Sequence, residues 1–590
     1  MKTKIFCVLA AASLLLAGCD DLLDKDPRDT FLNNKAFWSN ENQVEGYSNA
    51  FYGFYGSAGS FYFNSLNDDQ VNPSFDNWTY TTVPNKSGVW SGMFTNIRQI
   101  NYMLDGLKIS TLPNATKARY EAIGRLNRAW EYYQLVQMYG DVQWEDHVID
   151  KLESEEVYGP RTDRDLVMDK VLEDLNFAIA NLPSNTSDKT EWGKEFAEAM
   201  KSDICLYEGT FCKYRTLAEN GKAPDLTRAN RYLQACVDAS ESLRTSGKFT
   251  LNVWTPDAKG KIYTIYNSLD LSSNDEVIFY NNYEKDVKMH GLCDFTSSST
   301  TQRGITKDAV DAFLFKDGRP LATTTLNTND KAQLDAQGHY SIAHLLQNKD
   351  KRLSLLIDPI ICFKNHGWIR NEPSPDGPLP AEMTSSTGYT IYKYDNPQLE
   401  LYYRTNTNTN YTDIPLFWYA VVLLNEAEAK AELGTITQTD LDNTVNLLQT
   451  RAELPALTLT PAADILARCP EGMTVDAFAA DPANNMGVSN LIWEIRRTRR
   501  CELMCDLDYR YWDLLRWHQL DKLDSNVHPN INRGANVSGV ADQTGLTVDG
   551  NYLVGTTATR TFLPKYYSYP IPSNDLTLNQ NPGMKQNIGW

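Results

Sequence analysis

The feature that most restricts what this chain can fold into is a series of long segments whose apolar residues recur at helical spacing. In residues 117–139, Ile123, Leu126 and Trp130 fall on one face of a helix, and Gly140 stands where that helix should end. No repeat of fixed period is evident, but successive helices of this kind predict a stack of helical hairpins. Further segments with the same spacing cover residues 89–107, 163–182, 195–217, 226–244 and 416–433.

The sequence between residues 251 and 415 has a different character. Short apolar runs at residues 276–280 and 389–394 predict strands, and long polar loops rich in Pro, Ser and Gly separate them. After this region the helical spacing returns, and it continues through residues 440–452 and 490–520. The change in pattern therefore marks a boundary on each side of residues 251–415.

The body of the protein, residues 36–590, divides on this basis into three parts. Helical parts at residues 36–250 and 416–590 enclose the loop-rich part at residues 251–415. We expect a mainly α-helical fold in which helical hairpins form a scaffold. The loop-rich region, with its short strands, is expected to lie over that scaffold.

The N-terminus carries a short apolar run that ends in a cysteine. Lysines precede the run, which is shorter than the ~20 apolar residues needed to cross a bilayer, so a cleaved secretory signal is predicted. Residues 16–19, Leu-Ala-Gly-Cys, resemble the bacterial lipobox, after which Cys19 is lipidated. Residues 1–18 are then the signal peptide and residues 19–35 the lipidated tether. The alternative is an ordinary signal peptide whose cysteine has no role.

The net charge of −19 limits the partners of the protein. A surface this acidic argues against nucleic acid and against charge-driven binding to anionic lipid. The basic run at residues 496–500 could be an anion site, but its acidic neighbours predict structural ion pairs instead. Cys501, Cys505 and His518 could suggest zinc, but a second pair of ligands is missing. We therefore expect buried thiols, no metal site and no cofactor.

No sequence motif of a catalytic site is present. The chain lacks Gly-x-Ser-x-Gly, His-Glu-x-x-His and a phosphate-binding loop. Asp68 with Asp69, or Glu426 with Glu428, could be offered as the catalytic carboxylate pair of a glycosidase. A glycosidase sets two carboxyl groups on either side of one bond, however, and the sequence does not reveal that arrangement. The sequence therefore favours a protein that is not an enzyme.

Six blocks of sequence occur in the order that one known family shows. They are residues 34–38 (NKAFW), 125–142 (RLNRAWEYYQLVQMYGDV), 206–211 (LYEGTF), 424–429 (LNEAEA), 499–517 and 569–590. On these blocks the chain resembles the RagB/SusD-type outer-membrane nutrient-binding lipoproteins of Bacteroidetes. It departs from the family pattern at Gln143-Trp144, where Pro-Leu is common, and at residues 506–509 (DLDY), where the shorter Glu-Gly-x is usual.

The resemblance implies a tetratricopeptide-like (TPR-like) scaffold under a variable loop-rich region. It implies a lipid-anchored protein on the outer face of the outer membrane that binds oligosaccharides and passes them to a SusC-like TonB-dependent transporter. Asp20 and Asp21 resemble the surface-export signal of such lipoproteins, although they could be a plain acidic linker. The alternatives are capture of peptides or another nutrient, a surface glycosidase, and a scaffold that binds no ligand.

The resemblance also places the ligand-contacting aromatic residues in variable loops and not in the scaffold helices. Trp78 has no helical face to pack on, which favours exposure, but it could also anchor its loop in a surface groove. The tryptophans of the family blocks, Trp130, Trp512, Trp517 and Trp590, are expected to be structural. The predicted ligand-binding residues are Asp76, Asn77, Trp78 and Tyr80, then Asn282, Tyr283 and His290, and finally Trp368.

Overall fold

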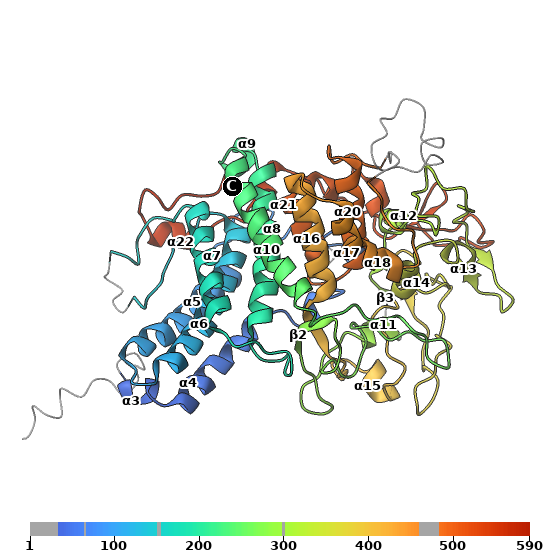
Figure 1. Ribbon diagram of the computed structural model, residues 1–590. Helices are drawn as coiled ribbons and strands as arrows, with labels where there is room; N and C mark the ends of the chain where they lie inside the picture. Colours follow the sequence, from blue (N-terminus) through green and yellow to red (C-terminus); the bar gives the residue numbers. More distant parts are fainter. Residues whose placement is uncertain (1–33, 64–65, 150–154, 298–300, 460–482) are drawn as a thin grey trace, which may run out of the picture.

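A layer of long helices forms one side of the molecule, and a loop-rich region forms the other (Figure 1). The computed structural model describes residues 34–63, 66–149, 155–297, 301–459 and 483–590. Each long helix packs against the one before it in the chain. These helices are α5 (Gly88–Ile109), α6 (Asn114–Tyr139), α7 (Arg164–Asn181), α8 (Lys194–Tyr214) and α10 (Leu226–Thr245).

The chain leaves this layer after α10 and returns to it much later. Helix α16 (Tyr419–Leu433) packs against α10 and α8, and α20 (Asn490–Glu502) packs against α16. The loop-rich region is therefore a long excursion from one continuous stack of helices. The prediction of a mainly helical scaffold with a loop-rich overlay is confirmed.

The helix ends follow from local residue chemistry. Gly140 ends α6 with a φ of 73°, and Gly434 ends α16 with a φ of 71°, values that favour glycine. The Asp163 carboxylate accepts a hydrogen bond from the Asp165 amide at the start of α7. The sequence-based stop at Gly140 is therefore confirmed, and the predicted ranges 163–182 and 416–433 match α7 and α16 closely.

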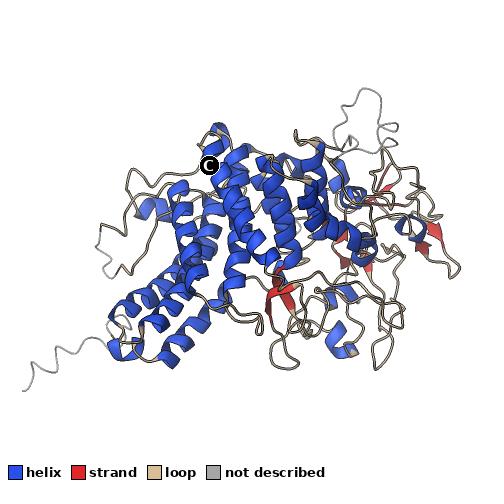
Figure 2. Cartoon of the chain, viewed as in Figure 1, coloured by secondary structure: helices blue, strands red, loops and turns tan. Residues whose placement is uncertain are grey.

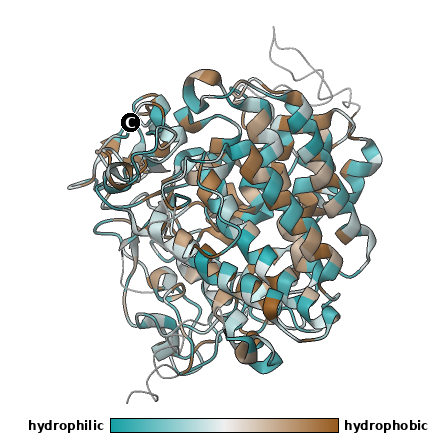
Figure 3. Cartoon of the chain, turned by 90° about the vertical axis from the view of Figure 1, so that its left-hand side faces the viewer, coloured by the Kyte–Doolittle hydropathy of each residue, from teal (hydrophilic) through white to brown (hydrophobic). Residues whose placement is uncertain are grey.

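Helix α16 is the centre of the scaffold, because every residue from 419 to 432 is buried. Its acidic side chains are paired: Glu426 lies 2.8 Å from the Arg244 guanidinium, and Glu428 lies 2.7 Å from Arg516. The outer helices differ from α16. Seen from the side, they carry hydrophilic and hydrophobic residues in alternation around their axes (Figure 3).

Two helix contacts depend on glycine because the packing leaves no room for a Cβ atom. A Cβ at Gly209 in α8 would lie 2.7 Å from the Cγ atom of Leu233 in α10. A Cβ at Gly106 in α5 would lie 2.2 Å from the indole of Trp38. Gly209 thus lets α8 and α10 approach closely, and Gly106 lets the Trp38 ring lie against α5.

The strands are short and scattered through the loop-rich side (Figure 2). Strand β2 (Val277–Asn281) pairs with β8 (Ile414–Trp418) in antiparallel fashion, so the predicted strand at 276–280 is confirmed. The predicted strand at 389–394 is wrong: Ile391 makes only an isolated bridge with Ile357. The other strands are β1 (Gln70–Val71), β3 (Thr301–Gln302), β4 (Gly304–Ile305), β5 (Gln333–Leu334), β6 (Tyr340–Ser341), β7 (Thr384–Ser385), β9 (Arg533–Asn536), β10 (Val548–Asp549) and β11 (Tyr552–Val554).

The predicted helix at residues 490–520 is in fact two helices. Helix α20 ends at Glu502, and α21 (Tyr509–Arg516) starts after a tight turn. Cys505, Leu507 and Asp508 in this turn have positive φ values of 71°, 44° and 60°. Positive φ is costly for residues with a Cβ atom, so packing and not local preference breaks this helix.

The remaining helices are short. No helix in the described ranges is both long enough and apolar enough to cross a bilayer. The short α-helices are α3 (Lys35–Trp38), α4 (Glu41–Ser48), α9 (Leu217–Asn220), α11 (Asp294–Ser297), α12 (Lys307–Ala312), α13 (Ala343–Leu346), α14 (Lys351–Leu356), α15 (Leu401–Thr405), α17 (Gln438–Asn443), α18 (Val445–Arg451) and α22 (Ser573–Leu578).

Candidate ligand-binding cavity

A cavity of about 280 Å³ lies between the scaffold helices and the turn that precedes α21. Its size is near the lower end of the ~300–1,000 Å³ range of ligand pockets, so it can enclose a small part of a long ligand. Helices α6, α8 and α21 and strand β8 all contribute to its lining. The lining residues that matter below are Thr79, Trp130, Gln134, Tyr509, Trp512 and Tyr569.

The aromatic rings of the cavity are held in place by their neighbours. The Trp130 indole N–H donates to the Phe54 carbonyl oxygen at 3.2 Å, and the Trp130 ring lies 5.6 Å from that of Tyr55. Trp512 packs edge to face on Tyr511 with ring centroids 5.0 Å apart. Trp130 and Trp512 are only partly buried. Fixed, partly exposed indole faces are suited to the apolar C–H faces of sugar rings.

Polar groups without protein partners accompany these rings. Within the described residues, the Gln134 amide, the Tyr509 hydroxyl and the Trp512 indole N–H make no hydrogen bond. Burial raises the pKa of Tyr509 well above its usual value, so its hydroxyl stays protonated. The cavity therefore offers hydrogen-bond donors and acceptors to a neutral, hydroxyl-rich ligand.

The charged residues of the cavity lining already have partners. Arg499 Nε lies 2.8 Å from the Asp513 carboxylate, and Arg516 Nε donates to the same carboxylate at 2.9 Å. Burial raises the pKa of Asp203, which lies 3.7 Å from Arg499. Because these charges compensate each other, the cavity has no strong preference for a charged ligand.

The structure places the first predicted segment, residues 76–80, beside this cavity but turns its tryptophan away. Trp78 is only 6% exposed and stacks on Tyr566, with ring centroids 4.2 Å apart. Its indole N–H donates to the Thr561 carbonyl oxygen at 2.8 Å. Of the two alternatives for Trp78, exposure is therefore wrong and the loop anchor is confirmed, because the C-terminal segment supplies the packing face that the local sequence lacks.

The other residues of this segment lie in different environments. The Asp76 carboxylate accepts a hydrogen bond from Asn72 at 3.0 Å, and Asn77 is exposed. The Tyr80 hydroxyl lies 3.1 Å from the Ser87 hydroxyl. The residue of this loop that lines the cavity is Thr79, which the sequence reasoning did not select.

In the second predicted segment, residues 282–290, two of the three predicted residues face inward although most of the segment is exposed. Asn282 is exposed, but Tyr283 and His290 are buried with their rings 4.6 Å apart. His290 Nδ1 accepts a hydrogen bond from the Leu292 amide, so Nε2 donates to the Thr412 carbonyl oxygen at 2.8 Å. Burial lowers the pKa of His290 to about 4. A neutral histidine with both nitrogens engaged has no atom left for a ligand.

The third candidate, Trp368, belongs to a separate apolar cluster with Cys362 and Met383. It is 7% exposed, and its backbone pairs with that of Met383. The structure therefore does not bring the three predicted groups into one site. Ligand contact by these residues stays a prediction, and the burial of their aromatic rings weighs against it.

The residues that sequence reasoning missed stand on the scaffold itself. Trp130 and Trp512 were assigned to structure because they lie in family blocks, yet both line the cavity. One signal was available: Gln134 lies four residues after Trp130, on the same face of α6, where an apolar residue would be expected. That contrast alone could not show that the face is open.

The residues that suggested a catalytic carboxylate pair or an anion-binding site are already engaged in ion pairs. Arg510 holds both oxygens of Asp68, at 2.7 and 2.6 Å, and Arg500 holds Asp69 at 2.7 Å. Burial raises the pKa of Glu428, but Arg516 outweighs it and lowers that pKa to about 2. A general acid needs a raised pKa, so Glu428 is not suited to that role. The predicted pairing of the basic run is confirmed at Arg500, as it is at Arg496 and Arg499.

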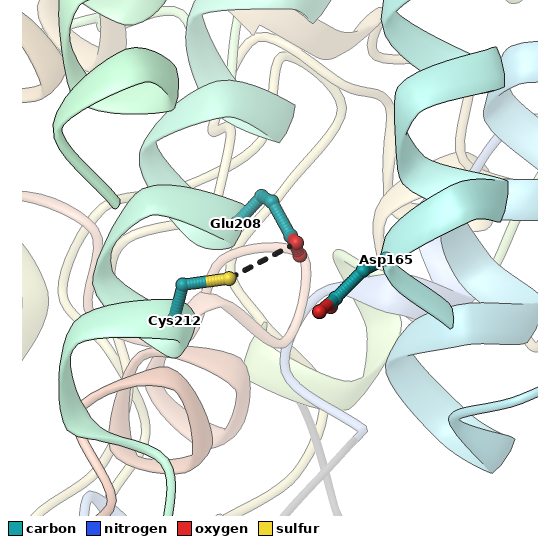
Figure 4. A group of neighbouring side chains, drawn as sticks. All are labelled: Asp165, Glu208 and Cys212. Atoms are coloured by element: carbon teal, nitrogen blue, oxygen red, sulfur yellow. Dashed lines mark hydrogen bonds between the residues drawn. The ribbon is translucent and has the colours of Figure 1, made fainter. Parts of the chain in front are cut away.

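One group of possible metal ligands among the described residues is Asp165, Glu208 and Cys212 (Figure 4). The Cys212 thiol donates to Glu208 at 3.2 Å, and burial raises its pKa, whereas a metal-bound cysteine must lose its proton. Arg164 lies 2.6 Å from Glu208, and Arg215 lies 2.7 Å from Asp165. Arginines therefore occupy the positions that a cation would take.

A second acidic group, Glu241, Glu426 and Asp440, has a lysine at its centre. The Lys430 ammonium lies 2.5, 3.0 and 2.6 Å from these three carboxylates. Cys501 and Cys505 are buried as expected, and burial raises the pKa of Cys501 to about 12. These groups are accounted for by ion pairing and packing.

Comparisons with known proteins decide the family. The profile of the SusD family matches residues 271–590, more than half of the chain. The chain belongs to the SusD family. A second profile, described as starch-binding and associating with the outer membrane, matches residues 30–206. A SusD-like protein of Bacteroides ovatus is 29% identical over 210 residues, and the match spans 32% of this chain but only 37% of that relative.

Solved structures show the same fold over nearly the whole SusD-family chain. A SusD-like protein from Bacteroides fragilis has a TM-score of 0.67 at 21% identity, covering 96% of this chain and 100% of its own. A SusD-like carbohydrate-binding protein from the same species has a TM-score of 0.65 at 20% identity, covering 93% and 100%. The family thus includes carbohydrate-binding proteins, and the recognition made from the six sequence blocks is confirmed.

Proposed function

We propose that this protein is a non-catalytic glycan-binding lipoprotein of the cell surface, and that it holds part of an oligosaccharide in the cavity between α6 and α21. The observation that carries this proposal is the combination of two fixed indole faces, Trp130 and Trp512, with the unpartnered polar groups of Gln134 and Tyr509. Sugar rings present apolar faces and hydroxyl edges, which these groups match.

The charge of the protein supports a neutral glycan over an anionic one. The net charge is −19, and the charged residues that line the cavity are paired among themselves. An anionic sugar would be repelled by the surface, and both arginines among the described lining residues, Arg499 and Arg516, are already paired. A neutral oligosaccharide meets neither penalty.

The sequence supports the remaining parts of the proposal. Cys19 would carry the lipid anchor in the outer membrane, and Asp20 and Asp21 would direct the body to the outer side; all three lie outside the described residues. The protein would deliver the captured oligosaccharide to a SusC-like TonB-dependent transporter. Capture of peptides by the same architecture is the alternative.

The decisive experiment is affinity electrophoresis and calorimetry of the protein against a panel of neutral polysaccharides. Retardation by at least one glycan is expected, and Trp512→Ala should weaken that binding about tenfold through loss of one stacking face. Tyr402→Ala is the matched control, since Tyr402 is 56% exposed and does not line the cavity.

Three results would contradict the proposal. Binding of peptides but of no glycan would support the alternative function. Unchanged glycan affinity in Trp512→Ala would place the site elsewhere on the protein. Release of reducing sugar from any polysaccharide would contradict the non-catalytic role.

A further inference from the structure

Lys261 is a buried lysine whose ammonium group faces a small second cavity. The side chain is 5% exposed, and the cavity has a volume of about 40 Å³. The Nζ atom lies 3.4 Å from the centroid of the Tyr392 ring. Across the described ranges of the chain, Nζ makes no hydrogen bond and no ion pair.

Other buried lysines of this protein have oxygen acceptors. Lys189 donates to the Asn274 carbonyl oxygen at 2.6 Å, and Lys349 donates to the Phe313 carbonyl oxygen at 2.7 Å. An ammonium group that is removed from water without an acceptor costs several kcal/mol of folding free energy. The ring of Tyr392 offsets part of this cost, but it leaves the N–H donors of Lys261 unused.

Two of the acidic groups near Lys261 are held by arginines, and a third, Glu372, accepts a hydrogen bond from the Tyr392 hydroxyl at 3.2 Å. Glu502, which lines the cavity, lies 3.2 Å from Arg352. Asp395, the acid that acts most strongly on Lys261, is held by Arg404 at 2.8 Å. Lys261 is thus a positive charge without a counter-ion in contact, beside open space.

We propose that this cavity binds a single small monovalent anion of the halide class, with the Lys261 ammonium as its main donor. About 10–15 Å³ of such space holds one water, so 40 Å³ is enough for a small anion such as chloride or bromide. The acidic surface does not prevent this, because charges beyond about 8 Å are screened at physiological salt.

The protonation behaviour of Lys261 agrees with this assignment. Burial lowers its pKa to about 8, because the charged form is desolvated and Arg370 adds to the repulsion. An anion in contact with Nζ would supply the missing favourable interaction for the charged form. The site is independent of the glycan-binding cavity, whose lining residues it does not share.

The first test is diffraction from crystals grown in sodium bromide, recorded at the bromine absorption edge. The expected result is an anomalous peak in hydrogen-bonding contact with Lys261 Nζ, and its loss in Lys261→Met. Absence of the peak from the wild-type protein, or its persistence in Lys261→Met, overturns the proposal.

A measurement in solution distinguishes a specific anion site at Lys261 from the alternative outcome, an adventitious ion only. Melting temperatures are compared in sodium bromide and in sodium gluconate of equal ionic strength, since the gluconate anion is far larger than a halide ion. The wild type should gain about 1–2 °C in bromide relative to Lys261→Met. Lys189→Met is the matched control and should keep the wild-type response, because Lys189 has its own acceptor. Equal responses of wild type and Lys261→Met overturn the proposal.

Discussion

The indole of Trp78 lies parallel to the ring of Tyr566, with an interplanar angle of 14°. This stack joins a loop near the N-terminus to the C-terminal segment, and the hydrogen bond from Trp78 to Thr561 strengthens it. The loop that the sequence suggested as a ligand platform is therefore fastened down by its tryptophan. The position of Thr79 and the shape of that side of the cavity depend on this anchor.

We expect Trp78→Ala to lower the free energy of unfolding by about 3–5 kcal/mol, because it removes a buried indole and its packing. Chemical denaturation measures this change. Trp78→Phe is the control: it keeps a ring on Tyr566 but loses the hydrogen bond to Thr561 and part of the buried indole, so it should cost about 1–3 kcal/mol, less than Trp78→Ala. A stable Trp78→Ala variant with reduced glycan affinity would instead support the original sequence-based role.

The close contact between α8 and α10 at Gly209 leads to a second prediction about stability. Gly209→Ala should destabilise the protein by about 1–3 kcal/mol, because the new Cβ would lie 2.7 Å from the Cγ atom of Leu233 and force α8 from α10. Gly92→Ala in α5 is the matched control. No atom lies within 4 Å of its new Cβ, so the usual helix preference for Ala should stabilise it by about 0.5–1 kcal/mol. Equal effects at the two sites would contradict the tight α8–α10 contact.

In the turn before α21, we expect two substitutions of Asp508 to differ in stability. Asp508 has a φ of 60°, which glycine adopts without cost and alanine does not. Asp508→Gly should therefore be more stable than Asp508→Ala by about 1 kcal/mol. Both variants remove the same carboxylate, so its lost interactions cancel in the comparison. Equal midpoints in urea would show that the turn relaxes out of the left-handed conformation.

His290 makes the stability depend on pH. Its pKa is about 4 in the folded protein and close to 6.5 when unfolded, so the unfolded chain binds a proton first as the pH falls. The stabilisation of the folded state by neutral His290 is complete above pH 6.5 and is lost as the pH falls towards 4. It amounts to on the order of 3 kcal/mol in the free energy of unfolding. Urea titrations at several pH values measure it. His290→Asn should flatten the stability profile in this window, and an unchanged slope would contradict the assignment.

Much of the scaffold could be predicted because its signals are local. The helices α5 to α10 follow from apolar residues at helical spacing and from stops such as Gly140, which depend only on neighbouring residues. The break at residues 503–508 could not be predicted, since no glycine or proline marks it and Leu507 is forced to positive φ by tertiary packing. The predicted strand at 389–394 was wrong for a related reason. A strand needs a partner, and only a single bridge from Ile357 reaches it.

The candidate site shows the same division between local and long-range information. By itself, the sequence determined the order of helices, the family and the abundance of aromatic residues, because these depend on short-range pattern. Only the tertiary structure decided that Trp78 is buried while Trp130 and Trp512 line a cavity. The physical reason is that exposure depends on segments far apart in the chain: residues 561–566 cover Trp78, whereas the turn before α21 leaves one face of α6 open.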